Sequence, residues 1–117
     1  MAVFASRQIV LPVVLEPIVV TIIGSGNETK CYATINGTKQ YSAGTHEVNT
    51  GDMITFSVFG SVMDRGFVKI DGTQVLKATG SATQTYNWTV PNGISTIEIA
   101  MEYSPNPKYG KITVTTA

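Results

Sequence analysis

The chain has 117 residues, and its eight basic and eight acidic residues give a formal net charge of zero at pH 7. Charged residues make up only 14% of it, against roughly 25% in ordinary domains. This balance argues against a nucleic-acid-binding protein, which needs an excess of Lys and Arg to displace counterions from phosphates. It also argues against a polybasic protein of the membrane surface. The length suits one domain with a single core.

Residues 1–17 are predicted to form an extended apolar arm. Pro12 and Pro17 block a helix and hold the residues before them in extended conformations. Because an extended arm cannot bury itself, it docks either on its own domain as an edge strand or on a neighbouring subunit, and the sequence leaves both options open. We hypothesise that residues 8–16 make the main intermolecular contact. The side chains of this interface are six aliphatic ones: Ile9, Val10, Leu11, Val13, Val14 and Leu15.

The apolar run over residues 9–23 raises the question of a membrane segment or a leader. Two prolines and Glu16 interrupt it, and it is shorter than the roughly 20 apolar residues of a membrane-spanning helix. A signal peptide would not carry Glu16 inside its apolar segment. We therefore expect a chain that folds in the cytoplasm and does not insert into a membrane.

Residues 18–117 have the composition and turn spacing of an all-β domain. Val, Ile and Thr together supply 40 residues, whereas Leu occurs three times. Side chains branched at Cβ lose rotamer freedom in helices and pack well on sheets. Asn36-Gly37 and Asp71-Gly72 tolerate the positive φ angles of two-residue hairpins, so the sequence predicts tight turns at both places.

Between the turns, apolar and polar residues alternate with a period of two. The clearest segments are 54–58, 86–90, 97–101 and 112–114. This pattern places one sheet face on a core and the other in water, as in antiparallel sheets. It predicts about seven to nine short strands in a β-sandwich and no helix longer than a turn or two. The predicted inward residues are Ile54, Phe56, Val58, Phe67, Tyr86, Trp88, Ile97, Ile99, Ile112 and Val114.

The segment from Tyr41 to Val58, YSAGTHEVNTGDMITFSV, resembles a strand–turn–strand pattern of immunoglobulin-like modules in phage virion proteins and bacterial surface proteins. The later VPNG at residues 90–93, followed by Ile97-Glu98-Ile99, is similar to the closing strands of such modules. The resemblance covers about residues 18–117. It implies an immunoglobulin-like β-sandwich in one of these contexts. The inter-sheet disulfide of antibody domains is absent, so no antibody-type function carries over.

The sequence contains none of the common enzyme motifs, neither a phosphate-binding Gly-rich loop nor paired Cys or His–Glu zinc motifs. We expect His46, the single histidine, on the solvent face of a strand. Cys31 shares a strand face with Ala33 and Ile35, so we interpret it as a small buried hydrophobe. The sequence therefore predicts no catalytic site and no cofactor.

The carboxylates near turns are interpreted as turn residues. Asp52, Asp64 and Asp71 belong to no calcium-loop array, and Asp next to Gly is typical turn chemistry. We therefore predict no metal site.

Aromatic residues raise the question of sugar binding, because rings stack on sugar faces. Trp88 and Tyr86 are assigned to the core by their alternation. The better candidates for exposure are Tyr32, Tyr41, Tyr103 and Tyr109. Exposed rings more often mark protein interfaces, so weak glycan binding is the alternative here.

Together these features favour a non-enzymatic structural protein with two parts, the arm at residues 1–17 and the sandwich at residues 18–117. The expected context is a phage virion assembled in the host cytoplasm, as a capsid decoration protein or a tail or neck accessory protein. Its partners would be other structural subunits, either further copies or a capsid or tail protein, and not nucleic acid. The alternative is an adhesin or a carbohydrate-binding module on a bacterial cell surface.

Overall fold

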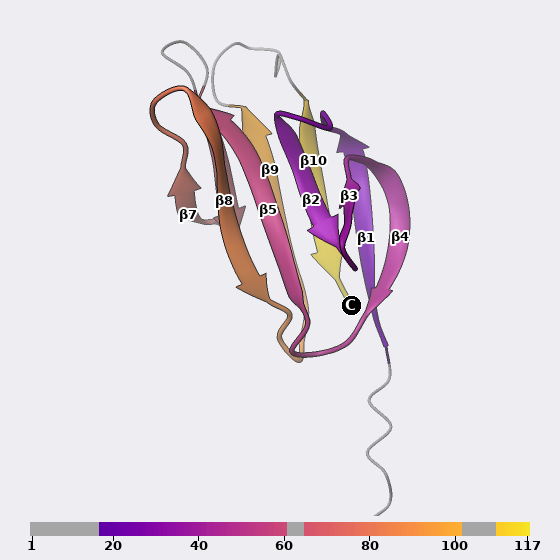
Figure 1. Cartoon of the computed structure of the whole chain (residues 1–117). Helices are drawn as coiled ribbons and strands as arrows, with labels where there is room; N and C mark the ends of the chain where they lie inside the picture. The colour runs from indigo at the N-terminus through magenta and orange to yellow at the C-terminus, as the bar shows by residue number, and fades with distance from the viewer. Residues whose placement is uncertain (1–16, 61–64, 102–109) are drawn as a thin grey trace, which may run out of the picture.

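The computed structural model describes residues 17–60, 65–101 and 110–117. In these ranges ten strands form two antiparallel sheets and no helix occurs, which confirms the all-β prediction (Figure 1). The strand number exceeds the expected range because the hairpin at Asn36-Gly37 returns as a strand of only three residues. Outside the described residues lie the six aliphatic side chains of the arm, Asp64, Tyr103 and Tyr109.

The strands divide unequally between the sheets. The six-stranded sheet has the order β4 (Ser42–Val48), β1 (Ile18–Ser25), β10 (Lys111–Thr116), β9 (Ser95–Met101), β6 (Gly66–Ile70) and β7 (Thr73–Lys77). The four-stranded sheet has the order β3 (Thr38–Gln40), β2 (Cys31–Ile35), β5 (Met53–Gly60) and β8 (Ala82–Thr89). In Figure 1 the four-stranded sheet lies in front of the other. The sheet edges are thus β4 and β7 behind, and β3 and β8 in front.

Both predicted hairpins are confirmed. Asn36 and Gly37 have φ angles of 52° and 78°, and Asp71 and Gly72 have φ angles of 50° and 86°. Two successive positive φ angles define the turn whose twist matches paired antiparallel strands. The first turn joins β2 to β3 and the second joins β6 to β7, with the flanking residues paired as expected.

The core lies between the sheets and follows the predicted alternation in most strands. The predicted residues that are 0% exposed are Ile54, Phe56, Val58, Ile97, Ile99, Ile112 and Val114. Inner-face residues of β1 and β2 complete the packing, among them Val20, Ile22, Ala33 and Ile35. At about 25 cal/mol per Å² of apolar surface, this shared layer is the main stabilising contribution to the fold.

Two aromatic predictions need correction. Trp88 and Tyr86 are only partly buried, because β8 is an edge strand and one side of each ring has no neighbouring strand to cover it. Phe67 does not face the core. Its neighbour Val68 is 0% exposed and pairs with Ile99, so Val68 takes the inward position on β6. Two adjacent apolar residues leave the alternation ambiguous, and the register with β9 decides it.

Candidate interaction surfaces

The pairing of β1 ends at its first residues, where the arm joins the domain. Ile18 pairs with Val48, the last residue of β4. On the other side, Val19 and Ala117 exchange two backbone hydrogen bonds, each of 3.1 Å. After Val48 the chain turns away, and the Asn49 N–H donates to the Asp52 carboxylate over 2.9 Å. The strands on both sides of β1 thus end level with Ile18, at the lower end of Figure 1.

The outer face of the six-stranded sheet carries a row of threonines beside two exposed aliphatic residues. Thr45, Thr21, Thr115 and Thr96 lie in register on β4, β1, β10 and β9. On the same face of β1, Val19 is 40% exposed and Ile23 is 57% exposed. Glu47 lies opposite Val19 and Thr113 lies opposite Ile23, so polar residues separate these two scattered exposed hydrophobics, which are normal on a protein surface.

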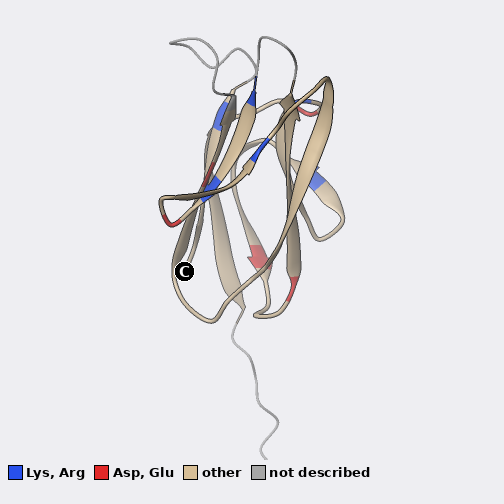
Figure 2. Ribbon diagram, turned by 90° about the vertical axis from the view of Figure 1, so that its left-hand side faces the viewer, with Lys and Arg blue, Asp and Glu red and all other residues tan. Residues whose placement is uncertain are grey.

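Charged residues are few and of mixed sign along the ribbon (Figure 2). Lys111 and Glu98 form an ion pair of 2.7 Å on the outer face of the six-stranded sheet. On the outer side of the four-stranded sheet, the ammonium groups of Lys30 and Lys39 lie 3.4 Å and 4.6 Å from the ring centres of Phe59 and Tyr32. At these positions one cation is paired with a carboxylate and two lie against aromatic rings, and Lys39 is the one charged residue in the described strands of the four-stranded sheet.

Cys31 is buried, as predicted. It is 0% exposed, and its thiol donates to the backbone carbonyl of Ile99 on the opposite sheet over 3.4 Å. Burial raises the pKa of the Cys31 thiol from 9.0 to about 12. The buried thiol is therefore neutral at physiological pH.

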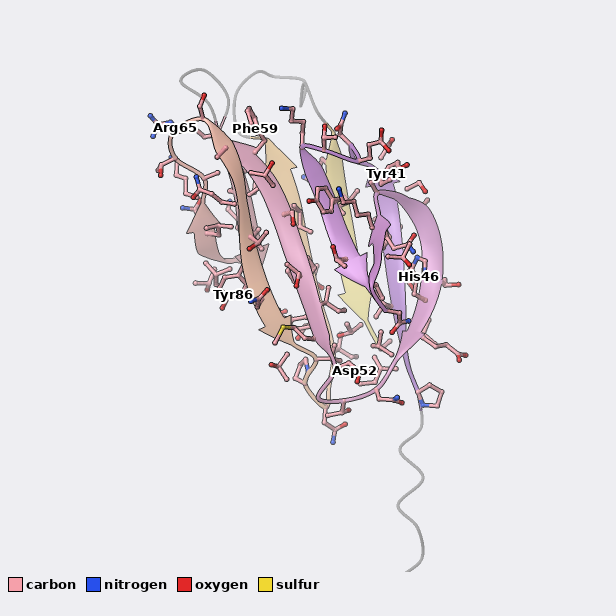
Figure 3. The ribbon with its side chains drawn as sticks, in the orientation of Figure 1. Tyr41, His46, Asp52, Phe59, Arg65 and Tyr86 are labelled. Carbon is pink, nitrogen blue, oxygen red and sulfur yellow. The ribbon has the colours of Figure 1, made fainter. Side chains whose placement is uncertain are left out.

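The expected position of His46 is wrong. His46 pairs with Val20, which is 0% exposed, so its side chain lies on the inner face of β4 and is partly buried. It remains accessible because β4 is an edge strand (Figure 3). The hydrogen bond of the Cys31 thiol goes to the Ile99 carbonyl and not to His46.

Asp52 and Asp71 are turn residues, as predicted. The Asp52 carboxylate accepts the backbone N–H of Asn49 over 2.9 Å, and that of Asp71 accepts the N–H of Thr96 over 2.8 Å. Each carboxylate thus already has a structural hydrogen bond. Within the described ranges, no three His, Cys, Asp or Glu side chains gather closely enough to hold a metal ion.

The described aromatic residues do not form one stacking platform. Tyr41 is 36% exposed in the link between β3 and β4, and Tyr86 lies on β8 at the opposite side of the domain (Figure 3). Trp88 packs on Phe56, with ring centres 5.8 Å apart. Tyr32 is partly covered by Lys39. Exposure is thus confirmed for Tyr41 and is only partial for Tyr32.

The free edge of β8 is the one candidate surface without a counterpart in the sequence analysis. Periodicity indicates which face of a strand is buried, but not whether the strand lies at an edge. The available signal was the absence of charge and proline in residues 82–89.

Comparisons with protein-family models, with curated proteins and with solved structures find no match to this chain. In the part of the chain that the structure describes, no helix is long and apolar enough to cross a membrane.

Proposed function

We propose that this chain is a non-enzymatic structural component of a larger assembly, a phage virion protein that docks through its N-terminal arm. The observation that carries the proposal is the end of the β1 pairing at Ile18, where β4 and β10 also end. The apolar residues 9–15 precede this point in the sequence, and β4, which ends at Val48, offers them no ladder to extend. An exposed run of this kind is an aggregation hazard and needs a partner surface.

The arm supplies enough apolar surface to anchor a subunit. Burial of its six aliphatic side chains contributes several kcal/mol of favourable free energy, at about 25 cal/mol per Å² of apolar surface. In a virion, a small subunit held in this way decorates the capsid or accompanies the tail or neck. Assembly then takes place in the host cytoplasm.

We also propose that the sandwich is immunoglobulin-like. In that fold, strands A, B and E are neighbours in one sheet, and strands G, F and C are neighbours in the other. The orders β2-β5-β8 and β10-β9-β6 reproduce these neighbours when β2 is strand A and β10 is strand G. On this assignment β7 extends the second sheet as strand C′, while β1, β3 and β4 are additions at the opposite side.

The non-enzymatic part of the proposal rests on what the described polar groups do. Burial keeps the Cys31 thiol neutral, and the carboxylates of Asp52 and Asp71 stabilise turns. Nucleophilic catalysis requires a nucleophile and a base in contact, whereas the Cys31 thiol donates its hydrogen bond to the Ile99 carbonyl.

Deletion of residues 1–17 tests this function. We expect residues 18–117 to remain folded by circular dichroism but to lose association with the assembly in co-sedimentation. Unfolding of the truncated chain would mean that the arm is a strand of its own domain. Retained association would place the interface on the sheets or loops. Capsid, portal or tail genes beside the gene are expected, and a neighbourhood of surface-anchoring genes would favour the adhesin instead.

A further inference from the structure

Resting on the proposed function, we propose that residues 9–15 of one copy add as a fifth strand to the free edge of β8 in a second copy. β8 is the outermost strand of the four-stranded sheet and pairs with β5 along its full length, from Ala82 opposite Gly60 to Thr89 opposite Met53. Among the described residues, no strand pairs with its other side. Its sequence, ATQTYNWT, contains no charged residue and no proline, the usual features that protect an edge strand.

The backbone groups at this edge can be assigned from the ladder. Val90 donates its N–H to the Asp52 carbonyl and accepts from the Gly51 N–H, both over 2.8 Å, so its backbone points towards β5. Along an antiparallel strand, the backbone groups of alternate residues point to opposite neighbours. The backbone groups of Trp88 and Tyr86 therefore also point towards β5. The backbone groups that face the free edge belong to Thr83, Thr85, Asn87 and Thr89.

The other edges are shorter, irregular or partly capped. β3 has three residues, and β7 has five with an irregular register against β6. β4 has seven residues, but its register with β1 shifts near Ser42, and the Asn36 side chain donates to the Glu47 carbonyl over 3.0 Å. β8 is thus the longest regular edge in the described domain.

Residues 9–15 match this edge in length and chemistry. They number seven against eight in β8. Pro12 has no N–H, so in an added strand the backbone at Pro12 must face away from β8. By alternation, the backbone groups of Ile9, Leu11, Val13 and Leu15 then face β8. Their side chains share one face of the added strand, and in parallel pairing with β8 this apolar row lies on the face of the partly buried Tyr86 and Trp88.

The geometry makes the contact intermolecular. In the six-stranded sheet, β1 and β7 are four strand positions apart, about 19 Å at the usual spacing. β8 belongs to the facing sheet and packs against β7. The two sheets are separated by roughly 10 Å. Leu15 is three residues from Ile18, a reach of at most about 11 Å for an extended chain. Residues 9–15 therefore cannot run along β8 of their own chain, and a second copy receives them.

Unless two copies exchange arms reciprocally in a two-fold dimer, such a contact is heterologous, because the arm of one copy meets the edge of another. Contacts of this type close into rings or continue as filaments, according to the rotation between copies. Both outcomes suit a subunit that surrounds or lines a symmetric particle.

Proline substitution on β8 tests the acceptor edge. Thr85→Pro removes an N–H that faces the free edge and leaves the hydrogen bonds to β5 in place. The matched control is Thr45→Pro. The backbone groups of Val19 point towards the β10 side, where they bond to Ala117. By alternation, the backbone groups of Val20 and its partner His46 point towards each other. The N–H of Thr45 therefore points to the free edge of β4. By sedimentation velocity, we expect the wild type and Thr45→Pro to assemble and Thr85→Pro to be a folded monomer. Assembly of Thr85→Pro at wild-type affinity would overturn the proposal.

A second pair of variants in the arm decides the matter even if Thr85→Pro fails to fold. Val13→Pro removes an N–H assigned to face β8, and Val14→Pro removes one assigned to face away, as Pro12 does. We expect at least tenfold weaker association for Val13→Pro and less than threefold for Val14→Pro. Equal effects would contradict strand addition. A monomeric wild-type chain that still binds another particle protein through its arm would overturn the second-copy partner and leave the proposed function standing.

Discussion

The thiol of Cys31 on β2 donates to the backbone carbonyl of Ile99 on β9 over 3.4 Å, across the space between the two sheets. Both residues are 0% exposed. The contact therefore places an ionisable group at the centre of the core, where only its neutral form is stable.

The stability of the protein should consequently fall at alkaline pH through Cys31. Burial raises the pKa of this thiol from 9.0 to about 12 in the folded chain. The contribution of the neutral thiol to the free energy of unfolding is full below pH 9, and it is lost as the pH rises towards the folded-state pKa. In urea titrations, the wild type should lose roughly 2 kcal/mol more than Cys31→Ala between about pH 8 and pH 10.5. Identical pH profiles for the two proteins would show that the thiol ionises freely in the fold.

Phe56 should stabilise the domain more than Trp88. Phe56 is 0% exposed, whereas Trp88 covers it from the edge strand and stays partly exposed. We expect Phe56→Ala to cost about 3–5 kcal/mol, as for a fully buried ring. Trp88→Ala should cost about 2 kcal/mol, because less surface is lost and the gap opens to water. Urea denaturation measures both, and a larger loss for Trp88→Ala would contradict the packing described.

Gly24 should tolerate substitution less than Gly37. Both have positive φ angles, 93° and 78°, so alanine is strained at either position. A Cβ on Gly24 would collide with the carbonyl oxygen of Lys111 on β10, whereas a Cβ on Gly37 meets no atom within 4 Å. Gly37→Ala should cost about 1 kcal/mol. Gly24→Ala should cost about 3 kcal/mol, because the β1–β10 pairing must also shift. Equal melting temperatures of the two variants would refute this difference.

Asp71 should act as a hydrogen-bond acceptor in a left-handed turn rather than as a metal ligand. Its φ is 50°, and its carboxylate accepts the Thr96 N–H over 2.8 Å. Asn shares both properties, so Asp71→Asn should change stability by less than about 0.5 kcal/mol, and Asp71→Ala should cost about 1–2 kcal/mol. Chelators should leave the melting temperature of the wild type unchanged. A drop of several degrees in chelator would reveal a metal site.

Local features were readable from the sequence where one residue type determines the backbone or the face. Asn36-Gly37 and Asp71-Gly72 supply the positive φ angles of both hairpins, and strict alternation in residues 54–58 assigns the buried face of β5. At Phe67-Val68 two apolar neighbours compete for one inward position, and only the pairing with β9 resolves the choice.

Long-range arrangement was not readable, because periodicity carries no information about strand neighbours. The chain leaves the four-stranded sheet at Tyr41 and enters the other sheet as β4, which turns His46 inward at an edge. The position of β8 at an edge likewise leaves Trp88 half covered. The predicted interface residues from Ile9 to Leu15 lie outside the described residues and remain a prediction.

Amide hydrogen exchange of residues 8–16 tests the central claim most directly, because it reads the arm of the unmodified chain. If the arm docks on a partner, its amides exchange at least tenfold more slowly in the assembled particle than in the dissociated chain. The amides of β5 serve as the reference and should be equally protected in both states. Equal and fast exchange of residues 8–16 in both states would contradict docking through the arm.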